Sequence, residues 1–306
     1  MDFSIFGYNF MQNAILAGLF GGVACSLIGV FVVAMQLSFI GVCLSHAAFA
    51  GALFGALMGF NPLISALLFS LASAAILGPL SDRTELNPDA PIGIIFSLML
   101  GLAFLFMGLM PGPKTDALSL LWGSILTVTS RDLLFLGITA AAVSSFVILF
   151  FKEIQAVIFN REIALAVGIP ATAIFYLLLF LTGASITVSL PTIGGLLIFS
   201  LIINPAAAAY QLTYSLKRMF LISSGFGIIS CWFGLLFSYL FNFPCGATII
   251  IVSSLIFGIA VLLSPKRKVK EWEANEAPSK ILQSLGVKLG FAHRRGYQSP
   301  AKGNFS

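Results

Sequence analysis

The sequence predicts an all-α, polytopic integral membrane protein, a bundle of 8–9 transmembrane helices. The first observation is composition: 59% of the 306 residues are hydrophobic and only 9% are charged, whereas soluble domains carry about 25% charged residues. The second is segmentation, because the apolar residues fall into runs of about 20, the length that crosses a hydrocarbon core about 30 Å thick. Backbone polar groups in lipid must be satisfied within their own segment, so we expect these runs to be helices.

Nine apolar runs are long enough to span a membrane. Turn-forming or charged residues separate them at 61–62, 82–91, 111–114 and 242–244. The two runs that flank Pro191 are the least clearly separated, which leaves eight spans as the alternative. The first run is too long for a signal peptide and lacks a basic flank, so we expect it to be retained. The predicted spans are 14–36, 40–59, 61–81, 91–110, 132–152, 171–189, 192–212, 217–241 and 245–264.

Positive charge predicts the orientation, because short cytoplasmic loops carry an excess of Lys and Arg. Residues 265–306 contain nine Lys and Arg against three Glu, and we interpret them as a basic cytoplasmic tail after a transmembrane domain over 1–264. Nine spans then place Arg83, Lys217 and Arg218 on the cytoplasmic side, whereas eight spans break this pattern in the N-terminal half. The basic character belongs to the tail, so no nucleic-acid partner is expected.

Two segments are not predicted to span. Residues 153–170 form a short amphipathic stretch on the cytoplasmic side, ended by Gly168 and Pro170. Within 111–131 the apolar part, 117–128, is too short to cross and is expected to form an external or re-entrant helix.

Several catalytic and nucleotide-binding patterns are missing. The sequence has no GxxxxGK[ST] phosphate loop, no HExxH and no GxSxG. Its four cysteines show no CxxC spacing, so neither a structural zinc site nor a disulfide framework is expected. We therefore expect neither an enzyme nor a bound cofactor, and any energy from ATP has to come from a separate subunit.

His46 is the only histidine in a predicted span. An ionisable side chain within lipid is costly and usually faces a cavity or pathway, and neutral imidazole is a common transition-metal ligand. The alternative is a histidine that only hydrogen-bonds within the helix packing. Cys43, three residues earlier, can point toward the same helix face as a soft sulfur ligand, or it can be a small apolar filler.

Six stretches, in order over about residues 10–264, resemble the permease family of zinc, manganese and iron ABC importers. They are AGLFGGVACSLIGVFVV at 17–33, GVCLSHAAFAG at 41–51, LWGSILTVTSRDL at 121–133, FNREIALAVGI at 159–169, IGGLLIFSLIINPAAAA at 193–209 and GLLFSYLFNFPCGATIII at 234–251. The resemblance implies a BtuC-like helical bundle that works as a homodimer in a prokaryotic cell membrane. It further implies an ABC ATPase subunit, an extracytoplasmic metal-binding protein and a divalent metal as cargo.

The resemblance also implies site residues. In the family an Asp stands four residues before the histidine that matches His46, but this chain has Val42 there. Three outcomes stay open: His46 from a second copy completes the site, Cys43 contributes a ligand that favours zinc or copper(I), or the chain offers a passage without tight binding.

For contact with the ATPase, the family's cytoplasmic helix corresponds to 159–169. There the resemblance assigns coupling roles to Asn160, Arg161, Glu162, Ala164 and Gly168. Asn160 replaces the family's Asp, and we expect it to cap a helix that carries Glu162 in its first turn.

Two other functions compete with transport by an ABC importer. A membrane enzyme could use His46 as a general base, but it needs a second polar group at the same depth, and only Ser45 and Cys43 are near in sequence. A secondary transporter needs intramembrane acids to couple ions, and the predicted spans contain almost none.

Overall fold

The computed structural model describes residues 8–37, 39–83, 89–111, 125 and 128–266. These residues contain helices and no strands, which confirms the all-α membrane bundle. The helices are α1 (Asn9–Ala34), α2 (Ile40–Met58), α3 (Pro62–Arg83), α4 (Asp89–Leu109), α6 (Ser130–Leu149), α7 (Phe151–Phe159), α8 (Arg161–Ala166), α9 (Ala171–Ile193), α10 (Gly195–Leu212), α11 (Leu216–Phe241) and α12 (Cys245–Leu262).

All nine predicted spans correspond to a helix in the described part of the chain. Eight of these helices are long and apolar enough to cross a membrane. The ninth, α10, has 18 residues, of which the apolar part is Leu197–Leu212. Whether the chain has eight or nine spans therefore depends on whether the shorter α10 crosses the membrane.

The predicted break at Pro191 is wrong by three residues. Pro191 lies inside the last turn of α9, and the chain turns at Gly194, where φ is +89°. The amide of Gly194 donates to the carbonyl of Leu190 at 3.0 Å and closes α9. Glycine adopts a positive φ without the steric cost of a Cβ, so Gly194 rather than the proline separates α9 from α10.

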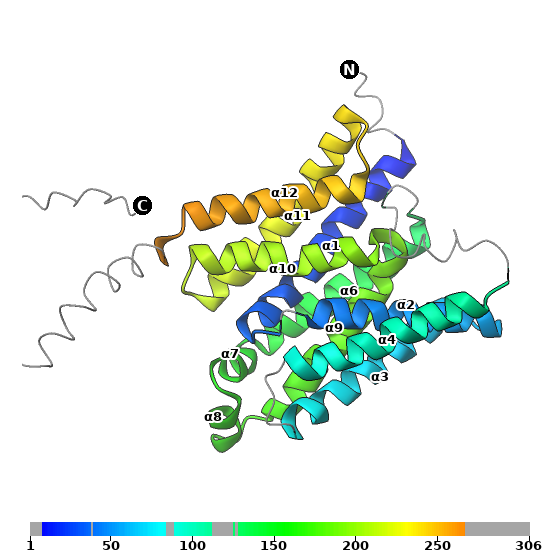
Figure 1. The fold of residues 1–306 in the computed structure, drawn as a ribbon. Coiled ribbons are helices and arrows are strands. Elements are labelled where there is room, and N and C mark those ends of the chain that lie inside the picture. The colour runs from blue at the N-terminus through cyan, green and yellow to red at the C-terminus, as the bar shows by residue number, and fades with distance from the viewer. Residues whose placement is uncertain (1–7, 38, 84–88, 112–124, 126–127, 267–306) are drawn as a thin grey trace, which may run out of the picture. The chain divides into compact units, whose positions relative to one another are not determined.

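The helices form two groups (Figure 1). In one group α1 packs against α10 and α11, and α12 packs against those two; in the other, α2 lies between α3, α4 and α9. Helix α6 contacts α1 and α9, while α2 and α10 contact each other, so the groups are joined. The short helices α7 and α8 follow α6 at one end of the bundle and lead into α9.

Small residues allow the closest helix contact in the first group. Gly29 of α1 lies against the backbone carbonyl of Ile202 in α10, where a Cβ would collide with it. Close backbone approach through small residues is a common way to pack helices in lipid, because burial of apolar surface drives little association there.

The chain divides into two compact units, residues 1–264 and 265–306. Of the second unit only Pro265 and Lys266 are described, so the predicted tail lies almost wholly outside the described residues. The predicted external or re-entrant helix at 117–128 also lies outside them, apart from Ile125 and Val128.

Candidate functional site

His46 lies in the N-terminal half of α2, the helix at the centre of its group. Most of α2 is buried, but His46 and Val42, four residues earlier, are only half-buried. The imidazole packs against Phe96 of α4 in a T-shaped contact, with ring centroids 5.0 Å apart and planes at 83°. The imidazole of His46 therefore lies on the face of α2 that is only partly covered by other helices.

A hydrogen bond within α2 fixes the orientation and tautomer of this ring. Nδ1 of His46 lies 2.9 Å from the backbone carbonyl oxygen of Val42. A carbonyl oxygen only accepts, so Nδ1 has to donate, and the lone pair of the neutral ring is then on Nε2. No described residue hydrogen-bonds to Nε2. Metal-binding histidines almost always donate their other ring N–H in this way.

The neighbouring residues add no clear second ligand from the same chain. Cys43 is fully buried in the helix packing, whereas His46 is half-buried. Val42 stands at the position of the family's Asp and offers only its backbone carbonyl, which the imidazole already uses. Across the described residues, no three His, Cys, Asp or Glu side chains come close enough to hold a metal ion. The site therefore consists of one oriented imidazole.

A second polar group lies between the middle of α10 and the middle of α12. The amide nitrogen of Asn204 donates to the hydroxyls of Ser200, Ser253 and Ser254 at 2.9, 3.0 and 3.0 Å. The hydroxyls of Ser200 and Ser253 lie 2.9 Å apart. Asn204 is half-buried and Ser254 is exposed, which is unusual for polar groups at the depth of hydrocarbon.

The segment predicted at 153–170 forms two short helices, α7 and α8, separated at Asn160. The side-chain oxygen of Asn160 accepts from the amide of Ile163 at 3.0 Å, which confirms the expected cap, and Glu162 lies in the first turn. Gly168 has φ +86° and follows the end of α8, as expected for a helix-ending glycine. The sequence predicted the cap at Asn160 and the end of the segment at Gly168, but not that a separate helix, α7, begins at Phe151.

Arg161 faces the membrane-spanning helix α9. Its guanidinium lies 4.7 Å from the ring centroid of Phe175 and donates to the hydroxyl of Thr172 at 3.3 Å. Cation–π contacts of this kind contribute about 0.5–2 kcal/mol. Arg161 therefore joins α8 to α9.

Several apolar side chains of this segment are exposed. Phe159 is 83% exposed, Val167 69%, Ile163 53% and Leu165 47%. Glu162 is also exposed, while Ala164 is buried and cannot contact a partner directly. Exposed apolar residues with a charged residue beside them are typical of a protein-binding surface.

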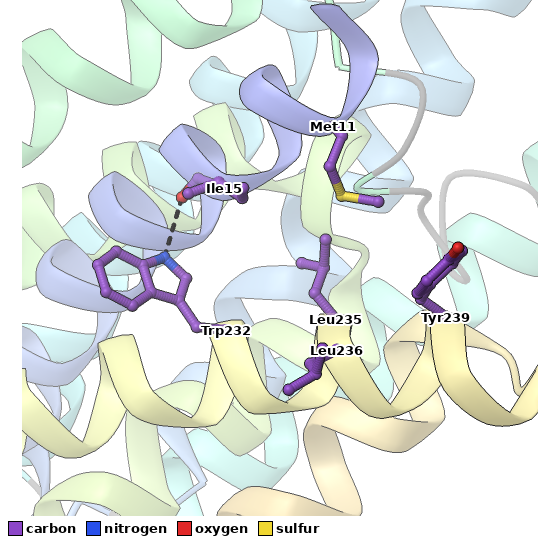
Figure 2. Close-up of a pocket in the computed structure, with 6 residues that line it drawn as sticks. All are labelled: Met11, Ile15, Trp232, Leu235, Leu236 and Tyr239. Atoms are coloured by element: carbon purple, nitrogen blue, oxygen red, sulfur yellow. Dashed lines mark hydrogen bonds between the residues drawn. The ribbon is translucent and has the colours of Figure 1, made fainter. Parts of the chain in front are cut away.

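The cavity in Figure 2 lies between the beginning of α1 and the end of α11 and has a volume of about 260 Å³. The indole nitrogen of Trp232 donates to the carbonyl of Ile15 at 3.2 Å across it. The described residues that line it, which include Met11 and Tyr239, contain no His, Cys, Asp or Glu. Trp and Tyr at the end of a span are typical of the membrane–water interface, so this cavity is a poor candidate for a metal site.

Three features of these sites did not come from sequence reasoning. The contact of His46 with Phe96 and that of Arg161 with Phe175 join different helices, and nothing in the sequence pattern identifies such pairs. Asn204 did carry a signal, because an amide side chain within an apolar span is rare enough to be noticed.

Comparison with known proteins identifies the family. Residues 7–264 match the model of the ABC 3 transport family. The manganese transport system membrane protein MntC of Listeria monocytogenes is 34% identical over 260 residues, which cover 85% of this chain and 92% of that protein. The manganese import system permease protein ScaB of Streptococcus gordonii is 31% identical over 264 residues, 85% of this chain and 94% of that protein.

A solved structure supports the same assignment. A chain in the structure of PsaBC from Streptococcus pneumoniae in complex with Fab superposes with a TM-score of 0.78 and 29% identity, over 88% of this chain and 97% of that one. This agreement confirms the expected ABC permease architecture. The match to the family model over residues 7–264, together with the fold, shows that this multi-pass membrane chain belongs to the ABC 3 transport family.

Proposed function

We propose that the chain is the membrane-spanning subunit of an ABC importer that carries a divalent transition metal across a prokaryotic cell membrane. The metal assignment rests on the state of His46. Its Nδ1 donates to the carbonyl of Val42, and its Nε2 has no partner among the described residues. Two curated relatives, MntC and ScaB, are named for manganese. Manganese is therefore the first candidate cargo, with zinc and iron as the alternatives.

A single imidazole binds a divalent ion weakly. Without a carboxylate four residues earlier, no negative charge offsets the desolvation of the ion. Weak binding suits a pathway, because an ion held tightly in the membrane is released slowly. We therefore propose His46 as a transient ligand, with metal selectivity set mainly by the extracytoplasmic binding protein, and Cys43 as the weaker candidate because its thiol is buried.

Two copies of the chain would flank the pathway. Two observations support a dimer. His46 is only half-buried. The polar group of Asn204, Ser200, Ser253 and Ser254 includes one exposed residue, Ser254. Polar groups at this depth are less costly against protein or a water-filled pathway than against lipid. A homodimer would also bring two imidazoles toward one ion.

The energy would come from two ATPase subunits bound at α7–α8, with the C-terminus on the cytoplasmic side. The exposed apolar side chains Phe159, Ile163, Leu165 and Val167 would dock on the ATPase, and Arg161 would transmit its movement to α9. ATP binding and hydrolysis would then change which side of the pathway is open, a shift between two conformations.

The experiment is reconstitution of the chain in proteoliposomes with its ATPase and its metal-binding protein. Uptake of manganese, zinc and iron is measured with ATP and with a non-hydrolysable analogue. ATP-dependent uptake of at least one metal is the expected result. Absence of uptake for all three, with an assembled complex that hydrolyses ATP, would overturn the proposal.

A further inference from the structure

A further cavity in the described part of the chain is lined by neither His46 nor Asn204. It is a groove of about 530 Å³ between α1, α6 and α11, closed at one end by the first residue of α7. Binding sites for small molecules typically have volumes of about 300–1,000 Å³. The groove is therefore large enough for part of an organic ligand.

The walls of the groove are apolar, and its two ends differ in polarity. Val23 and Leu27 of α1, Val147 of α6 and Leu221 of α11 provide the aliphatic walls. Lys217, at the beginning of α11, lies at one end beside Phe151.

Toward the middle of the helices the groove ends at Ser144 and Ser224. At a rise of about 1.5 Å per residue, Lys217 and Ser224 are about 10 Å apart along α11. That length is about two thirds of one leaflet of a hydrocarbon core about 30 Å thick. The groove is thus deep enough for about two thirds of an acyl chain that enters from one membrane surface.

The positive charge at the mouth of the groove indicates the chemistry of the ligand's polar end. Lys217 is exposed, and its ammonium has no ion-pair or hydrogen-bond partner recorded among the described residues. The described residues that line the groove include no acid. A cationic side chain at the mouth of an apolar groove between membrane helices is suited to an anionic lipid headgroup.

We propose that this groove is a binding site for an anionic phospholipid, with an acyl chain between α1, α6 and α11 and the phosphate at Lys217. The ring of Phe151, the first residue of α7, packs against Phe220 of α11 with centroids 6.2 Å apart, and both rings line the groove. A lipid bound here touches the point where α6 passes into α7. The site is argued from the groove alone and does not depend on which cargo the chain carries.

The test is native mass spectrometry of the full-length chain, delipidated in detergent and titrated with phosphatidylglycerol or phosphatidylcholine of the same acyl chains. Phosphatidylglycerol should bind with a higher affinity. Lys217→Ala should weaken that affinity about fivefold, since a basic residue near the membrane surface contributes about 1 kcal/mol to anionic lipid binding. Ser144→Phe, which fills the deep end of the groove, should lower the binding affinity for both lipids.

Each variant has a matched neighbour outside the groove. Arg218→Ala removes an adjacent exposed charge, and Ser145→Phe adds the same ring to an adjacent exposed position of α6; neither residue lines the groove. Both controls should bind phosphatidylglycerol like the unsubstituted chain. Equal affinity for the two lipids, or equal loss in Lys217→Ala and Arg218→Ala, would mean unspecific lipid association and would overturn the site.

Discussion

Helix α2 and the segment α7–α8 differ in what the chain leaves for a partner. In α7–α8 two polar side chains are used internally: Asn160 caps α8, and Arg161 contacts Thr172 and Phe175 of α9. The segment also exposes several large apolar side chains, of which Phe159 is 83% exposed. In α2 most apolar residues are buried, and the polar side chain left without a complete set of partners is the imidazole of His46.

The two regions therefore lack different partners. The α7–α8 segment is fixed to α9 and lacks only a surface to cover its apolar side chains, which suits rigid-body coupling to another protein. The α2 site is oriented but lacks further ligands, which suits a transient contact with an ion or the assembly of two copies. Four predictions test this contrast, in order of decreasing effect.

The double substitution Phe159→Asp and Ile163→Asp should reduce affinity for the ATPase subunit at least about tenfold. Charge replaces two apolar anchors, and central apolar contacts of an interface often contribute about 2 kcal/mol or more each. The measurement is co-purification and titration of the ATPase. Gln155→Asp adds a charge at an exposed polar position of α7 and should have little effect; an equal loss in this control would contradict apolar docking.

Val42→Asp should strengthen divalent metal binding about tenfold. A carboxylate four residues before His46 shares its helix face, at about 5–6 Å between Cβ atoms. Equilibrium dialysis of manganese against the purified chain gives the affinity. Val42→Asn supplies an oxygen without the charge and should have a smaller effect. An unchanged affinity for manganese in Val42→Asp would mean that Nε2 of His46 cannot bind an ion.

Arg161→Ala should loosen α8 from α9 by about 1 kcal/mol, the scale of a cation–π contact at a partly exposed site. Hydrogen exchange of residues 161–166 should speed up about fivefold. Glu162→Ala, at the next and exposed position, should leave exchange nearly unchanged. The same rate in both variants would show that Arg161 does not fix the segment.

The smallest effect is expected for Asn160→Ala. Loss of the side-chain bond to the amide of Ile163 should cost about 0.5–1 kcal/mol of local helix stability. Faster exchange of that amide is the readout, and Asn160→Asp should retain protection because a carboxylate also caps. Slower or unchanged exchange in Asn160→Ala would contradict the capping role.

The sequence predicted the bundle well because lipid imposes strict local rules. Apolar length gave the nine helices that match the predicted spans, and local residues gave the cap of α8 at Asn160 and its end at Gly168. The error at Pro191 has a local cause, since a proline near the end of a helix can be accommodated and Gly194 provides the turn.

The sites were less predictable because they depend on contacts between distant residues. His46 stood out as an ionisable residue in a span, but its packing on Phe96 and the state of its ring nitrogens required coordinates. The role of Arg161 depends on Phe175, fourteen positions later on another helix. The apolar groove at Lys217 is formed by four helices and has no sequence motif.

The most direct test of the central claim is ATP-dependent metal uptake by His46→Ala in proteoliposomes, with assembly and ATPase binding measured on the same sample. Uptake should fall at least about tenfold while the ATPase still binds, because Nε2 of His46 would be the group that contacts the ion. Ser45→Ala, which removes a hydroxyl that bonds only to the carbonyl of Val42, should transport normally. Uptake by His46→Ala equal to that of the unsubstituted chain would contradict the account and leave His46 as a packing residue.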